Sequence, residues 1–251
     1  ADDAQKHYDL ALGLQQELVA DFPTVRAYRQ EFAGSQSNLG GLLLTRGRAD
    51  DAQKRYEVAI GLRQRLAADF PTVPTYRQEL ADSHSRLGIL LMGRGWSDDA
   101  QKHYELALGI HQKLAADFPD IVAYRVNLAG YQCNFGNLLI ELRKPTEALA
   151  WYGRAIATLE GVLKQVKTDV TAQQFLRNAH AGRATVFDHL KRSAAAATDW
   201  DKAVELTPEK ERAGLRMGRA GSRVRAGQVD EALKEVDKLV AGADAESLYG
   251  A

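Results

Sequence analysis

The sequence repeats itself with a period of 48 residues, and this repeat constrains the fold more than any other feature. The run Ala-Asp-Asp-Ala-Gln-Lys at residues 1–6 returns at residues 49–54, and again with serine in first place at residues 97–102. Residues 1–48 and 49–96 are identical at 31 of 48 positions. A fourth copy begins at Pro145, and a shorter, divergent unit follows Asp199. Self-similarity of this length is typical of arrays in which each unit stacks on the next.

Each copy has the pattern of two amphipathic helices. Acidic residues open the first helix, where they suit the free N–H groups and the helix dipole. Pro23 ends that helix, and Gly47 is suited to a left-handed cap after the second. Two antiparallel helices cannot bury both of their faces, so neighbouring units must stack. The apolar positions that define the two faces in the first copy are Ala4, Tyr8, Ala11 and Leu18, then Tyr28, Phe32, Leu39 and Leu43.

We therefore predict an all-α protein, a solenoid of antiparallel helix hairpins with about 11 helices, in which residues 1–251 form one array. The register of the last two hairpins stays open, because Arg219 and Arg223 fall near places where apolar residues are expected. The predicted elements are a leading helix over 1–21, hairpins over about 24–69, 72–117, 120–166, 169–207 and 209–241, and a frayed tail over 242–251.

Composition excludes several classes of protein. The 33 basic and 33 acidic residues cancel, which argues against a general binder of nucleic acid or of anionic membranes. A single cysteine excludes an intrachain disulfide framework and a cysteine-based zinc site. No apolar run approaches the roughly 18 residues that cross a bilayer. Because the chain starts at Ala1 without a signal-like segment, we expect a cytoplasmic location and a fragment of a longer protein.

A second pattern lies within the repeat. Leu39-Gly40 is followed by Ala52, Tyr56 and Ala59, and equivalent residues recur 48 and 96 positions later. This pattern resembles the tetratricopeptide repeat, in which small residues let two helices approach and the aromatic ring fills the space between hairpins. The usual period is about 34 residues, so this chain adds about two turns to each helix. The long form is similar to arrays in large bacterial signalling proteins, often joined to serine/threonine kinase domains, and the resemblance implies a right-handed superhelix and a scaffolding or regulatory role.

The resemblance also implies that the second helix of each copy lines a concave groove. Positions 30, 34, 37, 41 and 45 lie opposite the core stripe at 100° per residue, and their residues differ between copies. We predict that they form a ligand groove; the alternative is that they are simply solvated and unconstrained. The predicted partner-binding residues are Gln30, Ser37, Gln78, Asp82, Ser85, Ile89, Asn137 and Glu141.

Other polar groups have simpler interpretations. His7 and His103 are equivalent to Arg55, which cannot ligate a metal, so a polar surface role is expected and no metal site is predicted. The repeated Asp-Asp pairs are interpreted as helix caps rather than acid/base groups. Cys133 is expected to be a small, partly buried side chain. Trp96 either contacts a partner or packs over the next helix. The arginines of 212–223 are expected to pair internally rather than to bind an acidic partner.

These features predict a non-catalytic scaffold that binds a protein or peptide in its groove, with no cofactor, nucleic acid or membrane partner. Two alternatives stay open. The array could stack on a second copy of itself as a homotypic assembly scaffold, since it begins halfway through a hairpin. An all-helical enzyme with a site in the groove would need convergent titratable groups in one cleft, and the equivalent faces show none at matching depth.

Overall fold

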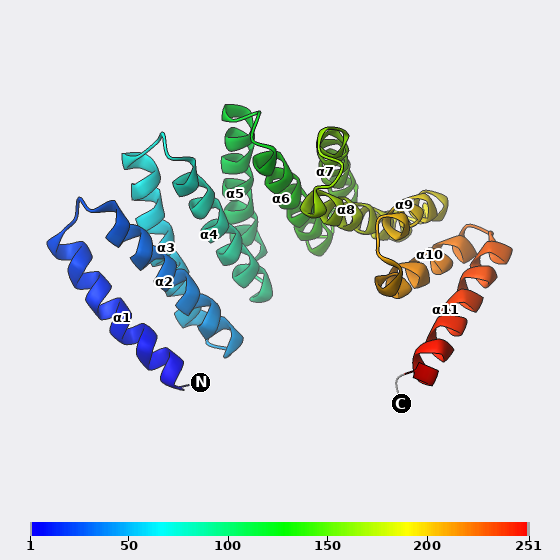
Figure 1. Cartoon of the computed structure of the whole chain (residues 1–251), viewed down its shortest axis with the longest axis horizontal. Coiled ribbons are helices and arrows are strands. Elements are labelled where there is room, and N and C mark those ends of the chain that lie inside the picture. The colour runs from blue at the N-terminus through cyan, green and yellow to red at the C-terminus, as the bar shows by residue number, and fades with distance from the viewer. Residues whose placement is uncertain (1, 250–251) are drawn as a thin grey trace. The chain divides into compact units, whose positions relative to one another are not determined.

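The computed structural model describes the backbone of residues 2–249 and the side chains of residues 6–8 and 10–240. Within that part the chain is all-helical, with eleven α-helices, one short 3₁₀ helix over Glu209–Glu211 and no strand, so the predicted fold class is confirmed (Figure 1). The α-helices are α1 (Asp2–Asp21), α2 (Arg26–Thr45), α3 (Ala49–Asp69), α4 (Pro74–Gly93), α5 (Ser97–Asp117), α6 (Val122–Glu141), α7 (Pro145–Gln165), α8 (Val170–His189), α9 (Ser193–Glu205), α10 (Ala213–Arg225) and α11 (Val229–Tyr249).

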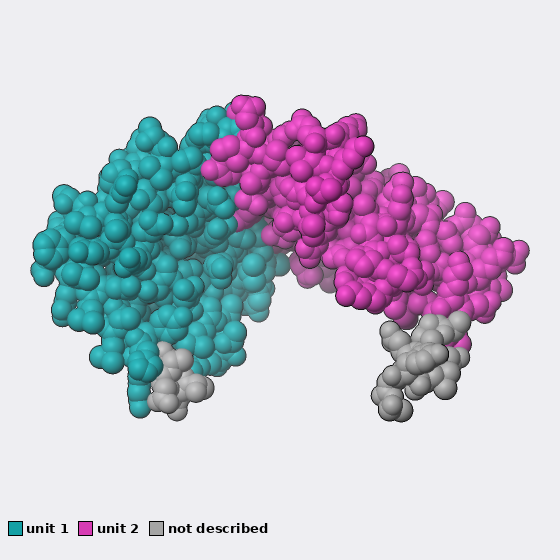
Figure 2. Space-filling view, viewed as in Figure 1, with its two compact units in different colours: residues 1–118 teal, residues 119–251 magenta. Residues whose placement is uncertain are grey.

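The helices belong to two compact units, residues 1–118 and residues 119–251 (Figure 2). Unit 1 contains α1 to α5 and unit 2 contains α6 to α11. Within each unit, helices that are consecutive in the chain form antiparallel neighbours that pack along their length. This is the solenoid arrangement in which each hairpin buries its faces against the hairpins on either side. The single array over the whole chain stays a prediction.

The 48-residue period is kept by the backbone further than the sequence suggests. The first helices of successive hairpins begin at residues 26, 74, 122 and 170, so register holds through α8. The period shortens only afterwards, because α9 and α10 have 13 residues each. The predicted end of the last hairpin at residue 241 is wrong, since the backbone of α11 stays helical to Tyr249. Residues 250–251 of the predicted tail lie outside the described part.

The close approach of helices that the repeat predicts is present. A Cβ placed on Gly40 would lie 2.8 Å from the Tyr56 ring, and one on Gly88 would lie 2.9 Å from the Tyr104 ring. Both tyrosines are buried. A larger residue at either glycine would push the two helices of the hairpin apart, so the Gly–Tyr contact sets the interhelix distance.

In unit 1, the repeated motif Asp-Phe-Pro with a following Tyr-Arg joins the start of the first helix of a hairpin to the end of its second helix. Arg29 of α2 donates to Asp69 of α3 at 2.5 Å, and Arg77 of α4 donates to Asp117 of α5 at 2.6 Å. The guanidinium of Arg29 also lies 5.8 Å from the centre of the Phe70 ring, within cation–π range. In unit 1, α2 and α4 are thereby each fixed to the C-terminal end of the following helix by an ion pair and a ring that contacts the guanidinium.

The turn inside each hairpin has a left-handed residue at a constant position. Gly47 and Gly95 have φ of 73° and 76°, as expected for a glycine cap. The equivalent residues in unit 2 are Arg143 and Lys191, both with φ of 56°. A side chain in this conformation is strained, so the turn geometry is kept even where glycine is lost.

The Asp-Asp pairs correct one prediction. Asp51 accepts from Arg48, and Asp99 accepts from Lys102, both on the same first turn. The N-cap residues of α3 and α5 make no side-chain capping bond. The carboxylates therefore favour the helix start through charge rather than as caps.

Candidate peptide-binding face

The eight predicted binding residues differ widely in accessibility. Ile89 is 53% exposed, and Asn137 and Glu141 are also exposed. The side chains of Gln30, Gln78 and Asp82 are half-buried. Ser37 and Ser85 are buried, so neither lines an open surface in this structure. Six of these residues belong to unit 1, whereas Asn137 and Glu141 belong to unit 2.

On α2, α4 and α6, the side of the helix that is exposed to solvent is rotated from the side that carries the predicted binding residues. The positions exposed in all three copies are those of Ala27, Asn38 and Thr45 and their equivalents 48 and 96 residues later. At 100° per residue, this stripe is centred roughly 40° from the predicted set. The prediction therefore missed Asn38, Arg86 and Asn134. The difference arises because the position of Ser37 packs inside the hairpin, beside polar pairs that join the two helices.

Those polar pairs connect residues 19 apart in the chain, from the first helix to the second. Arg55 donates to Gln36 at 3.3 Å, and the Nδ1 atoms of His84 and His103 share a hydrogen bond of 2.9 Å. Burial, and to a smaller extent repulsion by His103, lower the pKa of His84 to about 4. His7 is exposed, as expected, whereas His103 is half-buried because it pairs with His84. The separation of 19 residues between paired polar side chains could have been used to predict these contacts from the sequence.

The same offset also joins His180 to Asp199 in unit 2, at 2.8 Å. Arg183 donates to both oxygens of Asp199 through Nε and Nη2, at 2.7 Å each. Asp199 is buried, and although burial opposes it, hydrogen bonds from Arg183 and His180 lower its pKa. The sequence analysis did not identify this buried ion pair between Arg183 and Asp199. It joins α8 to α9 and lies away from open solvent, which gives it a structural role.

In unit 1, the outward face of α2 and α4 is braced by a polar network. Gln30 of α2 donates through Nε2 to Glu79 of α4 at 2.9 Å. Arg63 of α3 donates to Ser83 of α4, and its Nε lies 3.7 Å from Glu79. Burial lowers the pKa of Arg63, while Glu79 and Asp82 oppose that shift. The network holds α4 against the α2–α3 hairpin.

The same surface carries an exposed apolar side chain, that of Ile89 in α4. Ile89 takes the position that Gly41 has one repeat earlier. A Cβ added to Gly34 of α2 would meet no atom within 4 Å, so there is room above this helix. Arg86 lies one turn from Ile89 and forms a hydrogen bond with Tyr56, which opposes the rise in the pKa of Tyr56 caused by burial. The surface of α2 and α4 that is called the α2/α4 face below includes the exposed residues Arg86 and Ile89 and the half-buried residues Gln30, Gly34, Gly41, Gln78 and Asp82.

In unit 2, one predicted residue has a partner inside the protein. The hydroxyl of Tyr152 donates to Oδ1 of Asn137. Burial raises the pKa of that hydroxyl, so it stays protonated and able to donate. Asn137 therefore positions the ring that packs between hairpins. Glu141 is exposed at the end of α6.

The remaining chemical groups act structurally. Cys133 is buried, and burial raises the pKa of its thiol to about 12, which disfavours the reactive thiolate. The α10 arginines pair internally as predicted: Arg219 donates to both Asp201 and the buried Glu235. Among the described residues, no group of three or more His, Cys, Asp or Glu could hold a metal ion. The same residues contain no helix that combines the length and apolarity needed to cross a membrane.

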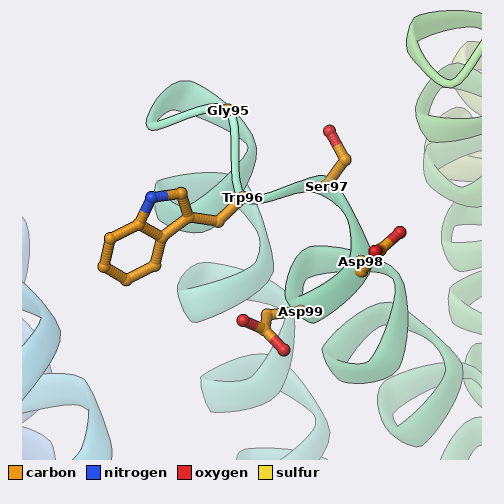
Figure 3. Close-up of a pocket in the computed structure, with 5 residues that line it drawn as sticks. All are labelled: Gly95, Trp96, Ser97, Asp98 and Asp99. Carbon is orange, nitrogen blue, oxygen red and sulfur yellow. The ribbon is translucent and has the colours of Figure 1, made fainter.

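Trp96 is exposed at the start of α5, and the guanidinium of Arg94 stacks 4.1 Å from the ring centre. A pocket of about 510 Å³ lies beside it, lined by Gly95, Trp96, Ser97, Asp98 and Asp99 (Figure 3). In Figure 3 the indole ring and the Asp98 carboxylate point in different directions. The pocket therefore lacks side chains that converge on one ligand.

The comparisons with known proteins agree with this architecture. A tetratricopeptide repeat family model matches residues 128–165. No curated protein sequence matches the chain. The crystal structure of BtubC (BKLC) from P. vanneervenii is 18% identical, with 97% of this chain and 91% of that chain covered and a TM-score of 0.73.

Two further solved structures have the same kind of fold. The apo form of RapI is 15% identical, with 94% of this chain and 59% of that chain covered and a TM-score of 0.67. A Podosopora anserina putative kinesin light chain with nearly identical TPR-like repeats is 14% identical, with 82% and 92% covered and a TM-score of 0.61. At these identities the likeness concerns the fold alone. Together with the repeat match, it supports a tetratricopeptide-type assignment.

Proposed function

We propose that this chain is a non-catalytic protein-interaction scaffold that binds a peptide or a segment of a partner protein on the α2/α4 face. The observation that carries the proposal is an exposed isoleucine, Ile89, at a position where the neighbouring repeats have Gly41 and Asn137. The residues that pack the hairpins together are the same at equivalent positions in successive repeats, because the fold requires them. Ile89 is 53% exposed, so packing within the hairpins does not account for this apolar side chain.

The chemistry of the face indicates the kind of peptide that fits. Ile89 offers an apolar contact, while Arg86 and Asp82 provide opposite charges within two turns of the same helix. Half-buried Gln30 and Gln78 place amide groups along the edge. An extended segment with one apolar anchor flanked by charged residues would use all of these groups. The glycines at 34 and 41 let its backbone approach closely.

A random-peptide display library selected on the purified chain tests the proposal. Selected peptides are expected to bind with micromolar affinity and to lose about ten-fold or more with Ile89→Glu, because a buried apolar anchor becomes charged. Leu106→Glu is the matched control, since Leu106 is 51% exposed on α5, away from this face. Peptides that bind both variants equally, or a library that yields no peptide, would contradict the proposed role of the face.

The finer assignments are part of the same proposal and rest on the sequence resemblance. They are a scaffolding segment within a larger bacterial signalling protein, an attached kinase domain and a cytoplasmic location. The sequence that flanks this chain in its gene tests the first two directly. A neighbouring kinase domain supports them, and a flanking sequence with no signalling domain contradicts them.

A homotypic assembly scaffold is the second candidate function, and one observation in unit 2 favours it. An apolar cavity of about 300 Å³ lies between α10 and α11. Met217 and Leu233 line it and are both largely exposed. Exposed apolar grooves of this kind often join copies of a protein. Sedimentation should then show an oligomer that dissociates in Leu233→Glu; a wild-type monomer at high concentration would exclude this candidate.

A further inference from the structure

A pocket with positively charged walls lies in unit 2, where the turn between α8 and α9 meets the end of α10. It has a volume of about 370 Å³, and the described residues that line it include Lys191, Arg192 and Arg225 but no carboxylate. Arg225 pairs with Asp188 at 2.7 Å. The guanidinium of Arg192 lies 4.6 Å from the centre of the Phe187 ring, and neither it nor Lys191 forms an ion pair within the described part of the chain. The pocket therefore keeps an excess of positive charge.

The start of α9 adds hydrogen-bond donors to the same pocket. Ala196 donates the first helical hydrogen bond, to the carbonyl oxygen of Arg192 at 3.1 Å. The backbone N–H groups of Ser193, Ala194 and Ala195 come before it and have no helical acceptor. The N-cap residue makes no side-chain capping bond, and the first turn carries no acidic residue. The positive end of the helix dipole is thus not balanced by any side chain of the turn that lines the pocket.

The hydroxyl group of Ser193 is an independent sign that the pocket takes a polar ligand. Ser193 lines the pocket and is only 8% exposed, and its side chain makes no hydrogen bond within the described residues. Buried hydroxyl groups in folded proteins normally have a partner, because burial removes their hydrogen bonds to water. A ligand in the pocket would supply that partner, beside the N–H groups of the same turn.

An earlier repeat shows which kind of group occupies this place. Arg48 precedes α3 as Arg192 precedes α9, three periods later in the sequence. Arg48 pairs with Asp51 of the first turn of α3 at 2.7 Å. The equivalent of Asp51 in α9 is Ala195. The arginine at this position therefore pairs with an anionic group at the helix start, and α9 has kept the arginine without the carboxylate.

We propose that this pocket, formed by Lys191, Arg192, Ser193, Ala194, Ala195 and Arg225 and called the α9 pocket, binds a phosphate monoester. A phosphate monoester carries close to two negative charges and three strong acceptor oxygens, which match several cations, N–H groups and a hydroxyl better than a carboxylate does. The phosphate can belong to a phosphorylated side chain of a partner or to a free small molecule, since the recognised group is the same. The α9 pocket shares no residue with the α2/α4 face, so either can fail without the other.

Nuclear magnetic resonance of the ¹⁵N-labelled full chain tests the proposal with three probes. These are inorganic phosphate, free phosphoserine and a capped Gly-Gly-phosphoserine-Gly-Gly peptide. Each should shift the amide signals of Ser193, Ala194 and Ala195 to saturation, whereas the same peptide with unphosphorylated serine should leave them in place. Arg192→Gln should weaken binding of every probe about ten-fold or more, because it removes a charged donor.

The repeats supply two matched variants. Arg48→Gln removes the equivalent arginine at a helix start where Asp51 already pairs with it, so phosphate binding should be unchanged. Ala195→Asp restores the carboxylate that α3 has, and this side chain should pair with Arg192 and abolish phosphate binding. Hydrogen exchange of α9 should stay as slow in Ala195→Asp as in the wild type, because an acidic residue suits a helix start. Loss of binding would then come from competition for the pocket and not from unfolding.

The probes also separate the two sources of the phosphate. A phosphopeptide that binds at least ten-fold more tightly than phosphoserine supports a phosphorylated partner segment, and equal affinities support a free small molecule. The proposal is overturned if the shifts grow linearly without saturation, or if a peptide with glutamate in place of phosphoserine binds as tightly. Unchanged phosphate binding in both Arg192→Gln and Ala195→Asp would overturn it as well.

Discussion

Tyr152 is the most tightly enclosed aromatic ring of the array, and one added methyl group should disturb it. The ring is 1% exposed and lies between Gly136 of α6 and Gly182 of α8. A Cβ at Gly182 would lie 2.5 Å from Cε1 and 2.7 Å from Cζ of this ring. The ring cannot move aside, because the Cβ position of Gly136 is only 3.0 Å from it on the other side. Gly182→Ala must therefore separate α8 from the α6–α7 hairpin.

The expected change in the free energy of unfolding for Gly182→Ala follows from two opposing effects. Alanine is about 1 kcal/mol more favourable than glycine inside a helix. Overpacking a close-packed core costs about 1–3 kcal/mol, and shifting Tyr152 also weakens its bond to Asn137, worth about 1 kcal/mol. Gly182→Ala should therefore destabilise unit 2 by about 1–3 kcal/mol. In contrast, Gly161→Ala in α7 meets no atom within 4 Å and should stabilise by up to about 1 kcal/mol.

Urea unfolding followed by circular dichroism measures both variants. Hydrogen exchange is needed beside it, because repeat arrays unfold partly unit by unit and one global free energy can hide a local change. The loss in Gly182→Ala should appear in α6, α7 and α8. The reasoning is refuted if Gly182→Ala is as stable as Gly161→Ala and α8 keeps its protection, since the close contact at Tyr152 would then be absent.

Three further predictions concern strain, pH and thiol reactivity. Arg143→Gly and Lys191→Gly should each raise stability by about 0.5–1 kcal/mol in urea titrations, because φ of 56° suits glycine better than a side chain; a decrease would contradict this. The folded pKa of His84, about 4, lies below the unfolded value of 6.5, so its contribution to stability is present above pH 6.5 and lost as the pH falls towards 4. Thermal unfolding should therefore show a smaller acid-induced drop in the His84→Gln, His103→Arg double variant, which copies the pair found one repeat earlier, than in the wild type; equal drops would refute the assignment. Cys133, with its pKa near 12, should resist a thiol reagent at pH 8 until urea unfolds the chain, and rapid labelling of the folded protein would contradict its burial.

The repeat made the fold predictable because the period of 48 fixes helix starts, turns and packing residues together. The Gly40–Tyr56 contact was implied by the resemblance to the tetratricopeptide repeat, and the left-handed turn at Gly47 was expected from a glycine at a helix end. The later register could not be read in the same way, because Ala172 takes the place of an aromatic while the backbone keeps the period. Phe175 compensates, since its ring lies against Gly130 of α6. The helices of this repeat therefore keep their positions although the aromatic residue has moved in the sequence.

The candidate face was predicted less well, for a geometric reason. An apolar stripe gives the direction of the core only to within about half a residue step, and polar residues such as Gln36 and Ser37 pack inside the hairpin with it. The predicted exposed side of the helices was consequently rotated from the observed one, and Arg86 was not among the predicted residues. Ile89 was found because its position, equivalent to that of Gly41, lies opposite the core stripe. Burial of short polar residues depends on cross-hairpin partners, and these become visible only once the helices are placed.

The claim that the α2/α4 face binds a peptide is tested most directly by hydrogen exchange of the whole chain with and without a display-selected peptide. Protection should increase in α2 and α4, around Gly34 and Ile89, and should disappear in Ile89→Glu. Protection confined to α3 and α5, with α2 and α4 unchanged, would contradict the claim.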